Sequence, residues 1–216
     1  YIYSRRQADA LAQRLPGVLV RPAMTYGLPG VADTMAELKA QGVTRILAVP
    51  LYPQYASSSS GAALDQVFRA MLRQRNQVGL RTVRSFYNHP AYIEALRQQV
   101  SAYWQQHGRG GHLMMSFHGI PQAHHDAGDP YPDECHETAR LLAAALGLDK
   151  QEYTVSFQSR FGGGKWLEPA TEDMFRSLPK QGVESLDVIC PAFVSDCIET
   201  MEEIAVEGRE TFHEAG

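Results

Sequence analysis

Hydrophobic and polar positions alternate along the chain with two different spacings. Short runs rich in β-branched and aromatic residues predict six strands, at residues 18–25, 45–50, 80–85, 112–117, 153–157 and 186–190. Between these runs, apolar residues recur every three or four positions, which predicts helices at residues 31–40, 62–75, 90–107, 132–146 and 195–212. Strands that alternate with helices are typical of parallel sheets covered by helices on both faces. The pattern therefore predicts an α/β fold.

The pattern also contains an internal repeat. Gly42 ends a predicted helix that leads into a strand, and Gly182 does the same about 140 residues later. Both glycines stand where a helix commonly ends in the left-handed conformation. We therefore predict two similarly built α/β lobes, residues 1–95 and 96–216, with a crossover helix at about residues 90–107. Because the chain starts with tyrosine and ends within a helical pattern, we expect both lobes to lack their outer parts.

Composition excludes several classes of protein. The 216 residues include 20 Lys and Arg against 24 Asp and Glu, a net charge of −4, which argues against a nucleic-acid partner. The longest apolar runs are about seven residues, whereas a transmembrane helix needs about 20. Cys135, Cys190 and Cys197 show no paired spacing, so neither a disulfide framework nor a structural zinc site is expected. Reduced thiols favour a cytoplasmic protein.

Aromatic residues follow several of the predicted strands. Ligands of open α/β sheets bind at the carboxyl ends of the strands, and those ends meet at one edge of the sheet. Around the single strand-end histidine, His118, the sequence places five rings that would suit a large, flat, aromatic ligand; they are Tyr26, Tyr52, Phe161, Trp166 and Phe193. For each ring taken alone, packing in the core is an equally good interpretation.

Carboxylates follow one face of the last predicted helix. Asp196, Glu199, Glu203 and Glu207 are spaced by three, four and four residues, so they share that face. A solvated surface explains such charges by default, since most charged residues are exposed. The alternative is a path that guides a divalent cation away from or towards the strand ends.

Five motifs resemble those of the ferrochelatase family, in its proteobacterial type, and they occur in the family's order from end to end of the chain. They are Leu51-Tyr52-Pro53-Gln54-Tyr55 with the serines that follow, Ser116-Phe117-His118-Gly119-Ile120-Pro121, Gly128-Asp129-Pro130-Tyr131-Pro132, Phe157-Gln158-Ser159-Arg160-Phe161-Gly162 with Trp166-Leu167, and the run from Cys190 to Thr200.

The resemblance implies insertion of Fe²⁺ into protoporphyrin IX with loss of two pyrrole protons, the last step of haem biosynthesis, in two pseudo-symmetric Rossmann-like lobes. It implies that His118 and Glu199 form the metal-binding and catalytic pair. Glu203 and Glu207 match the acidic helix face that conducts the ion, in a helix with a π-type widening, a feature common at functional sites. The resemblance also assigns porphyrin-pocket positions, namely Tyr26, Tyr52, Ser159, Phe161, Trp166 and Phe193.

The residue types agree with this chemistry. Histidine is a base with an ordinary pKa near neutrality, and imidazole with carboxylate suits Fe²⁺ but also Zn²⁺ or Co²⁺. Whether His118 or Glu199 accepts the protons stays open. Compared with the family, the first strand and the C-terminal portion are absent, so we expect this chain alone to be inactive.

Further expectations concern bound groups and partners. Ser57 stands where cluster-binding members have cysteine, so we expect no [2Fe–2S] cluster and no permanent cofactor, with Fe²⁺ as substrate. Coproporphyrin as the acceptor, cobalt as the ion and a non-catalytic porphyrin carrier are the alternatives. Peripheral membrane contact through a part outside this chain is compatible with a greasy substrate. The sequence does not determine the oligomeric state.

Overall fold

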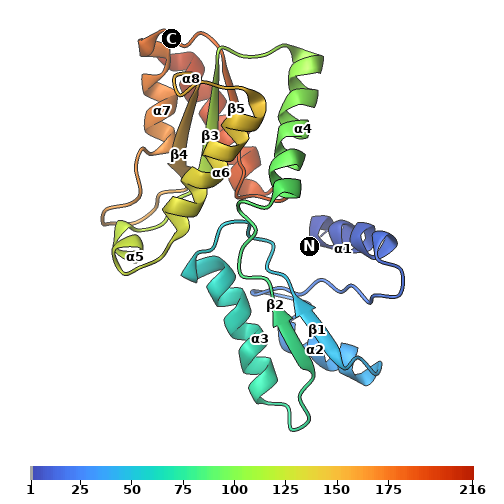
Figure 1. Cartoon of the computed structure of the whole chain (residues 1–216). Helices are drawn as coiled ribbons and strands as arrows, with labels where there is room; N and C mark the ends of the chain where they lie inside the picture. Colours follow the sequence, from blue (N-terminus) through green and yellow to red (C-terminus); the bar gives the residue numbers. More distant parts are fainter. Residues whose placement is uncertain (1) are drawn as a thin grey trace. The chain divides into compact units, whose positions relative to one another are not determined.

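A computed structural model of the chain describes residues 2–216, and Tyr1 lies outside the described residues (Figure 1). The chain forms two compact units. The first comprises the chain up to Leu51 together with Ala56–Ser85, and the second comprises Tyr52–Tyr55 and Phe86–Gly216. The α/β fold class predicted from the periodicity is confirmed in both units.

The first unit is built around a two-stranded parallel sheet. Its elements are α1 (Ile2–Arg14), α2 (Val31–Ala40), β1 (Arg45–Ala48), a π-helical turn η1 (Ser57–Gly61), α3 (Ala62–Leu72) and β2 (Gly79–Thr82). β1 pairs with β2 in parallel, with Arg45 opposite Gly79. Met35 of α2 and Val67 of α3 form a small core, against which Ile46 of β1 packs. The sheet thus buries one face against α2 and α3.

The predicted strand at residues 18–25 is wrong. Residues 18–23 form no strand, and Met24 makes only an isolated bridge to Gly30. A strand needs a neighbour that accepts and donates its backbone hydrogen bonds, and no other strand of the described chain pairs with this segment. Val18 and Leu19 are accordingly 56% and 48% exposed. The pattern also failed to predict α1, which directly precedes this segment.

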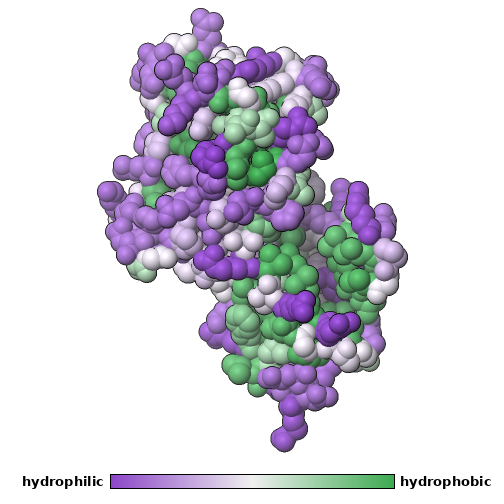
Figure 2. Space-filling model, viewed as in Figure 1, coloured by the Kyte–Doolittle hydropathy of each residue, from purple (hydrophilic) through white to green (hydrophobic). Residues whose placement is uncertain are grey.

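Apolar side chains on the first unit are unusually exposed. Besides Val18 and Leu19, Leu47 and Val49 lie on the sheet face opposite the core and are 60% and 43% exposed. Figure 2 shows apolar surface over the unit that carries β1 and β2. Apolar strand residues normally face a core, so this unit does not cover both faces of its sheet.

The second unit contains a three-stranded parallel sheet in the order β4-β3-β5 (Figure 1). Its strands are β3 (His112–His118), β4 (Tyr153–Gln158) and β5 (Leu186–Ile189). α6 and α7 both contact β4, and α4 contacts α6. Its helices are α4 (Pro90–His107), α5 (Gln122–Asp126), α6 (Tyr131–Leu146), α7 (Thr171–Ser177), the 3₁₀ turn η2 (Pro179–Gln181), the π-helix η3 (Glu199–Gly208) and α8 (Arg209–Ala215).

The core of the second unit lies under β3. Met114, Met115 and Phe117 are fully buried, so β3 is covered on both faces, as expected for the central strand of a parallel sheet. Because both of its faces are packed, β3 is held in place up to its carboxyl end. The residue at that end is His118, so the packing of the strand positions this histidine.

Helix α4 belongs wholly to the second unit. The predicted lobe boundary lies at residue 95, whereas the chain changes unit between Ser85 and Phe86, ten residues earlier. The cause is the packing of the first turns of α4: Tyr92 donates a hydrogen bond of 2.6 Å to the carbonyl of Pro191, and Ile93 is buried. The crossover helix is therefore the first element of the second unit.

The remaining elements largely follow the prediction. The other five predicted strands are confirmed, and Gly42 and Gly182 end their helical segments with positive φ angles of 83° and 89°. The helix predicted at 195–212 is instead a π-helix that continues into α8. Within residues 2–216, no helix is both long enough and apolar enough to cross a membrane.

Candidate active site

His118 ends the buried strand β3 and begins a tight turn. Its Nδ1 lies 2.7 Å from the carbonyl oxygen of Gly119. A carbonyl oxygen only accepts hydrogen bonds, so Nδ1 carries the proton of the neutral imidazole. Nε2 is then left with its lone pair. In its neutral form the half-buried ring presents Nε2 as the nitrogen that can act as a base or as a metal ligand.

The glycine after His118 allows two strand ends to meet. Gly119 N donates to Gln158 O at 2.7 Å, which joins the ends of β3 and β4. A Cβ atom at Gly119 would lie 2.9 Å from that oxygen and 3.3 Å from Cε3 of Trp166. Only glycine fits here, so the close approach explains this position of the motif.

Two aromatic pairs lie near these strand ends. The ring of Phe193 lies 6.3 Å from that of His118, and Phe161 lies 5.2 Å from Trp166, centroid to centroid. Trp166 is 8% exposed and packs under Gly119, whereas Phe161 is 72% exposed. Trp166 is therefore a structural wall, and Phe161 offers its ring to solvent.

The two tyrosines predicted for the site belong to different units. Tyr52 belongs to the second unit and is 41% exposed. Tyr26 belongs to the first unit and is 81% exposed. Their exposure excludes a core role for both rings. Their part in a porphyrin pocket stays a prediction.

Glu199, Glu203 and Glu207 lie on the π-helix η3, which has the widening that the resemblance implied, whereas Asp196 precedes that helix. Glu199 and Glu203 are half-buried, and Glu207 is exposed. Oε2 of Glu203 accepts hydrogen bonds from Ser159 Oγ at 2.7 Å and from Gln158 Nε2 at 3.3 Å. A purely solvated carboxylate makes no such bonds, so Glu203 does not fit the default interpretation of a solvated face.

A pocket of about 240 Å³ lies beside the π-helix. Glu203 and Glu207 line it, together with Ser159 and Gln158 at the end of β4 and Thr171 at the start of α7. The pocket therefore gathers two of the predicted path carboxylates on one wall. His118 and Glu199 are not among its lining residues.

Metal ligands are sparsely arranged. Among residues 2–216, no three His, Cys, Asp or Glu side chains are grouped so as to hold a metal ion. A pair of ligands, such as His118 with Glu199, is not covered by that observation, and their joint binding of a metal stays a prediction. Two ligands would bind an ion less firmly than the three or four of a permanent site.

The cysteines are free and protonated. Burial raises the pKa of Cys190 to about 12, and burial also raises that of Cys135. Burial together with a hydrogen bond to Glu199 raises the pKa of the Cys197 thiol. Since the thiolate is the nucleophile and metal ligand, none of the three is activated for that chemistry at neutral pH.

Some buried polar residues that support the site were not predicted. Gln158, the last residue of β4, is 4% exposed, and its amide is hydrogen-bonded to β3, to Cys190 directly after β5 and to the π-helix. Ser116, which donates to Gln158, and Thr171, which bonds to Ser116, are also buried. Gln158 and Ser116 lie within the motifs, but polar residues show no periodicity that marks them as buried.

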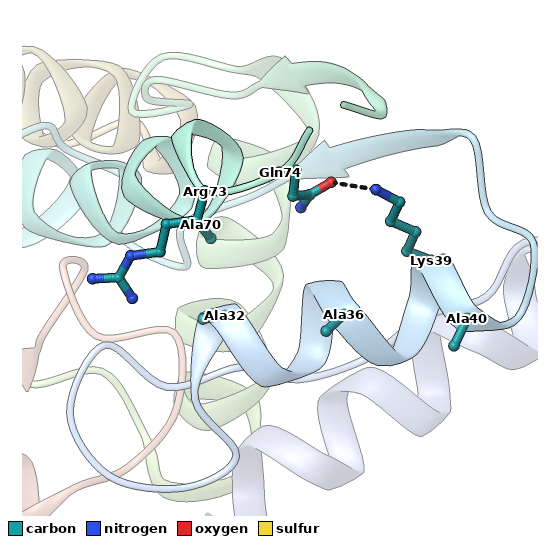
Figure 3. Close-up of a pocket in the computed structure, with 7 residues that line it drawn as sticks. All are labelled: Ala32, Ala36, Lys39, Ala40, Ala70, Arg73 and Gln74. Carbon is teal, nitrogen blue, oxygen red and sulfur yellow. Dashed lines mark hydrogen bonds between the residues drawn. The ribbon is translucent and has the colours of Figure 1, made fainter. Parts of the chain in front are cut away.

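A second hollow lies in the first unit between α2 and α3 (Figure 3). It has a volume of about 440 Å³ and none of the predicted site residues line it. Nζ of Lys39 donates to Gln74 across it at 3.4 Å. Its other lining residues are alanines and an arginine, namely Ala32, Ala36, Ala40, Ala70 and Arg73. We assign it no chemistry.

Comparison with known proteins first defines the class. The fold is a chelatase-like α/β architecture: the structure of SirB from Bacillus subtilis with Fe³⁺ matches 97% of this chain and 77% of its own, with a TM-score of 0.66. The two sequences are 16% identical, so this likeness concerns the fold alone.

Sequence comparison identifies the family. The ferrochelatase family model matches residues 1–216. The chain is 61% identical over 215 residues to ferrochelatase of Neisseria gonorrhoeae and 46% identical over 220 residues to that of Methylobacillus flagellatus. It is also 48% identical over 219 residues to ferrochelatase of Aeromonas hydrophila. This chain therefore belongs to the ferrochelatase family.

The match covers the whole of this chain but not the whole of the relatives. The chain spans 64% of the length of the Neisseria and Methylobacillus proteins and 68% of the Aeromonas protein. About a third of each relative thus has no counterpart here.

Proposed function

We propose that the protein containing this chain inserts Fe²⁺ into protoporphyrin IX with release of two pyrrole protons, the last step of haem biosynthesis. The observation that carries the proposal is His118: in a chain of the ferrochelatase family, it presents an unprotonated Nε2 at a strand end beside the ring of Phe193. Porphyrin metallation needs such a base next to an aromatic surface.

His118 is assigned the role of proton acceptor. Its Nδ1 proton is committed to the Gly119 carbonyl, so a proton taken from a pyrrole nitrogen goes to Nε2. The resulting imidazolium keeps that hydrogen bond. Glu199 is assigned to the ion, because a carboxylate and an imidazole together suit Fe²⁺.

Glu203 and Glu207 are assigned to the delivery of the ion. Both line the pocket of about 240 Å³ beside η3, and the Glu203 carboxylate is already oriented by Ser159 and Gln158. Carboxylates that line a pocket raise the local concentration of cations. Fe²⁺ is a substrate here, and a weakly held ion is one that can be released into the ring.

The aromatic residues are assigned to the porphyrin. Phe161 and Tyr52 have exposed rings in the second unit, and Phe193 lies beside His118. A macrocycle buries such rings by stacking, which contributes about 0.5–1.5 kcal/mol for each aromatic pair beyond the area buried. Trp166 supports the pocket from beneath Gly119, and Tyr26 and Ser159 complete the predicted set.

The remaining expectations belong to the same proposal. Ser57 in place of a cysteine supports the absence of a [2Fe–2S] cluster, and reduced cysteines support a cytoplasmic location. The net charge of −4 supports the absence of a nucleic-acid partner. The exposed apolar side chains of the first unit are compatible with peripheral membrane contact.

The test is anaerobic insertion of Fe²⁺ into protoporphyrin, followed by absorbance. It compares this chain, a version extended to the length of its relatives, and the extended version with His118→Ala. We expect insertion by the extended version and a loss of at least about 100-fold on removal of the base. Porphyrin binding without insertion would instead indicate a carrier, and insertion only of cobalt or only into coproporphyrin would identify another chelatase.

A further inference from the structure

Two consecutive residues at the end of β4 hold the same carboxylate oxygen of the π-helix. Gln158 Nε2 and Ser159 Oγ both donate to Oε2 of Glu203, at 3.3 and 2.7 Å. We propose that Gln158 and Ser159 are positioning residues that fix Glu203 and the first turn of η3 for delivery of the metal. We call the two hydrogen bonds from Gln158 and Ser159 to Glu203 the clamp. The role of Glu203 in metal delivery rests on the proposed function, whereas the clamp rests on the hydrogen-bond distances alone.

The amide of Gln158 is fully used, and its orientation follows from its partners. Nε2 donates to the Glu199 carbonyl at 2.9 Å as well as to Glu203, and both of these groups are acceptors. Oε1 accepts from Ser116 Oγ at 2.8 Å and from Cys190 Sγ at 3.5 Å. A flipped amide would place its oxygen against two oxygens, so only one orientation satisfies the site.

A chain of buried hydroxyls holds Gln158 from the other side. Ser116 Oγ lies 2.8 Å from Thr171 Oγ1, which lies 2.9 Å from Ser156 Oγ. These three residues come from β3, α7 and β4, and each is at most 2% exposed. Water cannot replace such partners without opening the core, so the network makes the amide rigid.

Ser159 reaches Glu203 from a strained backbone. Its φ angle is +62°, and among residues 2–216 it is the one residue other than glycine with a positive φ. This left-handed region is unfavourable for a residue with a Cβ atom and is held where the surroundings demand it. Glycine would remove the strain but also the hydroxyl, so serine here serves the bond to Glu203.

The clamp leaves one oxygen of Glu203 uncommitted. Both bonds reach Oε2, and Oε1 has no hydrogen-bond partner among residues 2–216. Glu203 and both clamp residues line the same pocket. The arrangement therefore presents a single oriented carboxylate oxygen that is free to meet a cation, in place of a mobile side chain.

The first test is kinetic and uses the version extended to the length of its relatives. Zn²⁺ and protoporphyrin are varied separately for the wild type, Ser159→Ala, Ser159→Gly and Gln158→Met. The control is Ser177→Ala, which removes a weak 3.5 Å bond to Met174 in the same unit. We expect the clamp variants to raise the KM for Zn²⁺ about 10- to 100-fold, as loss of supporting hydrogen bonds does around metal ligands. The KM for porphyrin of Gln158→Met, and both KM values of the control Ser177→Ala, should change less than about twofold.

The two substitutions of Ser159 separate positioning from stability. Glycine relieves the backbone strain and alanine does not, yet both lose the bond to Glu203. Equal rises in the KM for Zn²⁺ would support the clamp. A normal KM in Ser159→Gly, with a defect only in the less stable Ser159→Ala, would overturn it.

A second readout does not need activity. Hydrogen exchange is measured on this chain for the amides of η3 and, as an internal control, of β3. We expect Gln158→Met and Ser159→Gly to speed exchange in η3 about tenfold or more, with β3 unchanged. Unchanged exchange in η3 would refute the clamp. If the wild type inserts no metal but the exchange result holds, the proposed function fails and the clamp stands.

Discussion

Substitution of Gly208 tests how tightly the π-helix packs on the core. Gly208 is buried at the end of η3 and has helical φ and ψ angles of −63° and −43°. A Cβ atom there would lie 2.4 Å from Cε2 and 2.5 Å from Cζ of Phe175. Phe175 is 4% exposed and packs against Met114 and Leu178, so displacing its ring disturbs that part of the core.

The expected magnitude follows from two opposing effects. Alanine in place of glycine within a helix stabilises by about 1 kcal/mol. Overpacking in a dense core costs about 1–3 kcal/mol, and a contact of 2.4 Å is far below the distance between any two non-bonded carbon atoms in a real structure. A clash this close puts the cost at the upper end of that range, so Gly208→Ala should lower the free energy of unfolding by about 2 kcal/mol. For a chain of 216 residues this lowers the Tm by roughly 4–8 °C.

The assay is urea and thermal unfolding followed by tryptophan fluorescence. The only two tryptophans, Trp104 and Trp166, both belong to the second unit, so the signal reports on the unit that contains Gly208. Gly163→Ala is the matched control, because a Cβ there meets nothing within 4 Å. Phe175→Leu should lower the free energy of unfolding by less in the Gly208→Ala background than in the wild type. A Gly208→Ala protein as stable as the wild type would refute the reasoning.

Three other predictions concern partly buried hydrogen bonds and the thiol of Cys190. Tyr92→Phe removes the 2.6 Å bond to the buried carbonyl of Pro191 and should cost about 1–3 kcal/mol in urea unfolding; an unchanged midpoint would contradict this. Asp187→Ala leaves the Trp104 indole without its 2.6 Å acceptor, so stability should fall by a similar amount and the tryptophan emission should shift. Burial raises the pKa of Cys190 from 9.0 to about 12, so the unfolded chain loses this proton first and stability falls as the pH rises between these values. Cys190→Ala should therefore lose about 1.4 kcal/mol less than the wild type between pH 8 and pH 10, and equal losses would contradict the assignment.

The sequence was sufficient to predict the helices and strands that have a clear local pattern of apolar and turn residues. β3 and β4 are apolar runs bounded by turn residues, and both were predicted within one residue at each end. The segment at residues 18–25 has the same local signal but no partner strand among residues 2–216. Strand formation depends on that partner, which no local pattern contains.

The site could be predicted only in part, because some of its residues acquire their role through contacts with distant parts of the chain. Glycine and proline after His118 mark a turn at a strand end, so the sequence singles out this histidine. Gln158 and Thr171 are ordinary polar residues until folding buries them, and their bonds join residues 15 to 55 positions apart. The π-helix has apolar spacing close to that of an α-helix, and only the resemblance to the family predicted it. The bonds of Glu203 argue against a purely solvated acidic face, and the path for the ion stays a prediction.

Chemical rescue at His118 tests the central claim most directly. In the version extended to the length of its relatives, Zn²⁺ insertion into protoporphyrin is measured for the wild type and for His118→Ala, with and without added imidazole. If the Nε2 of His118 accepts the pyrrole protons, His118→Ala lowers the rate at least about 100-fold and imidazole restores part of it. Insertion by His118→Ala at the wild-type rate, or a loss that imidazole leaves untouched while porphyrin and metal still bind, would contradict the assignment of this histidine as the base.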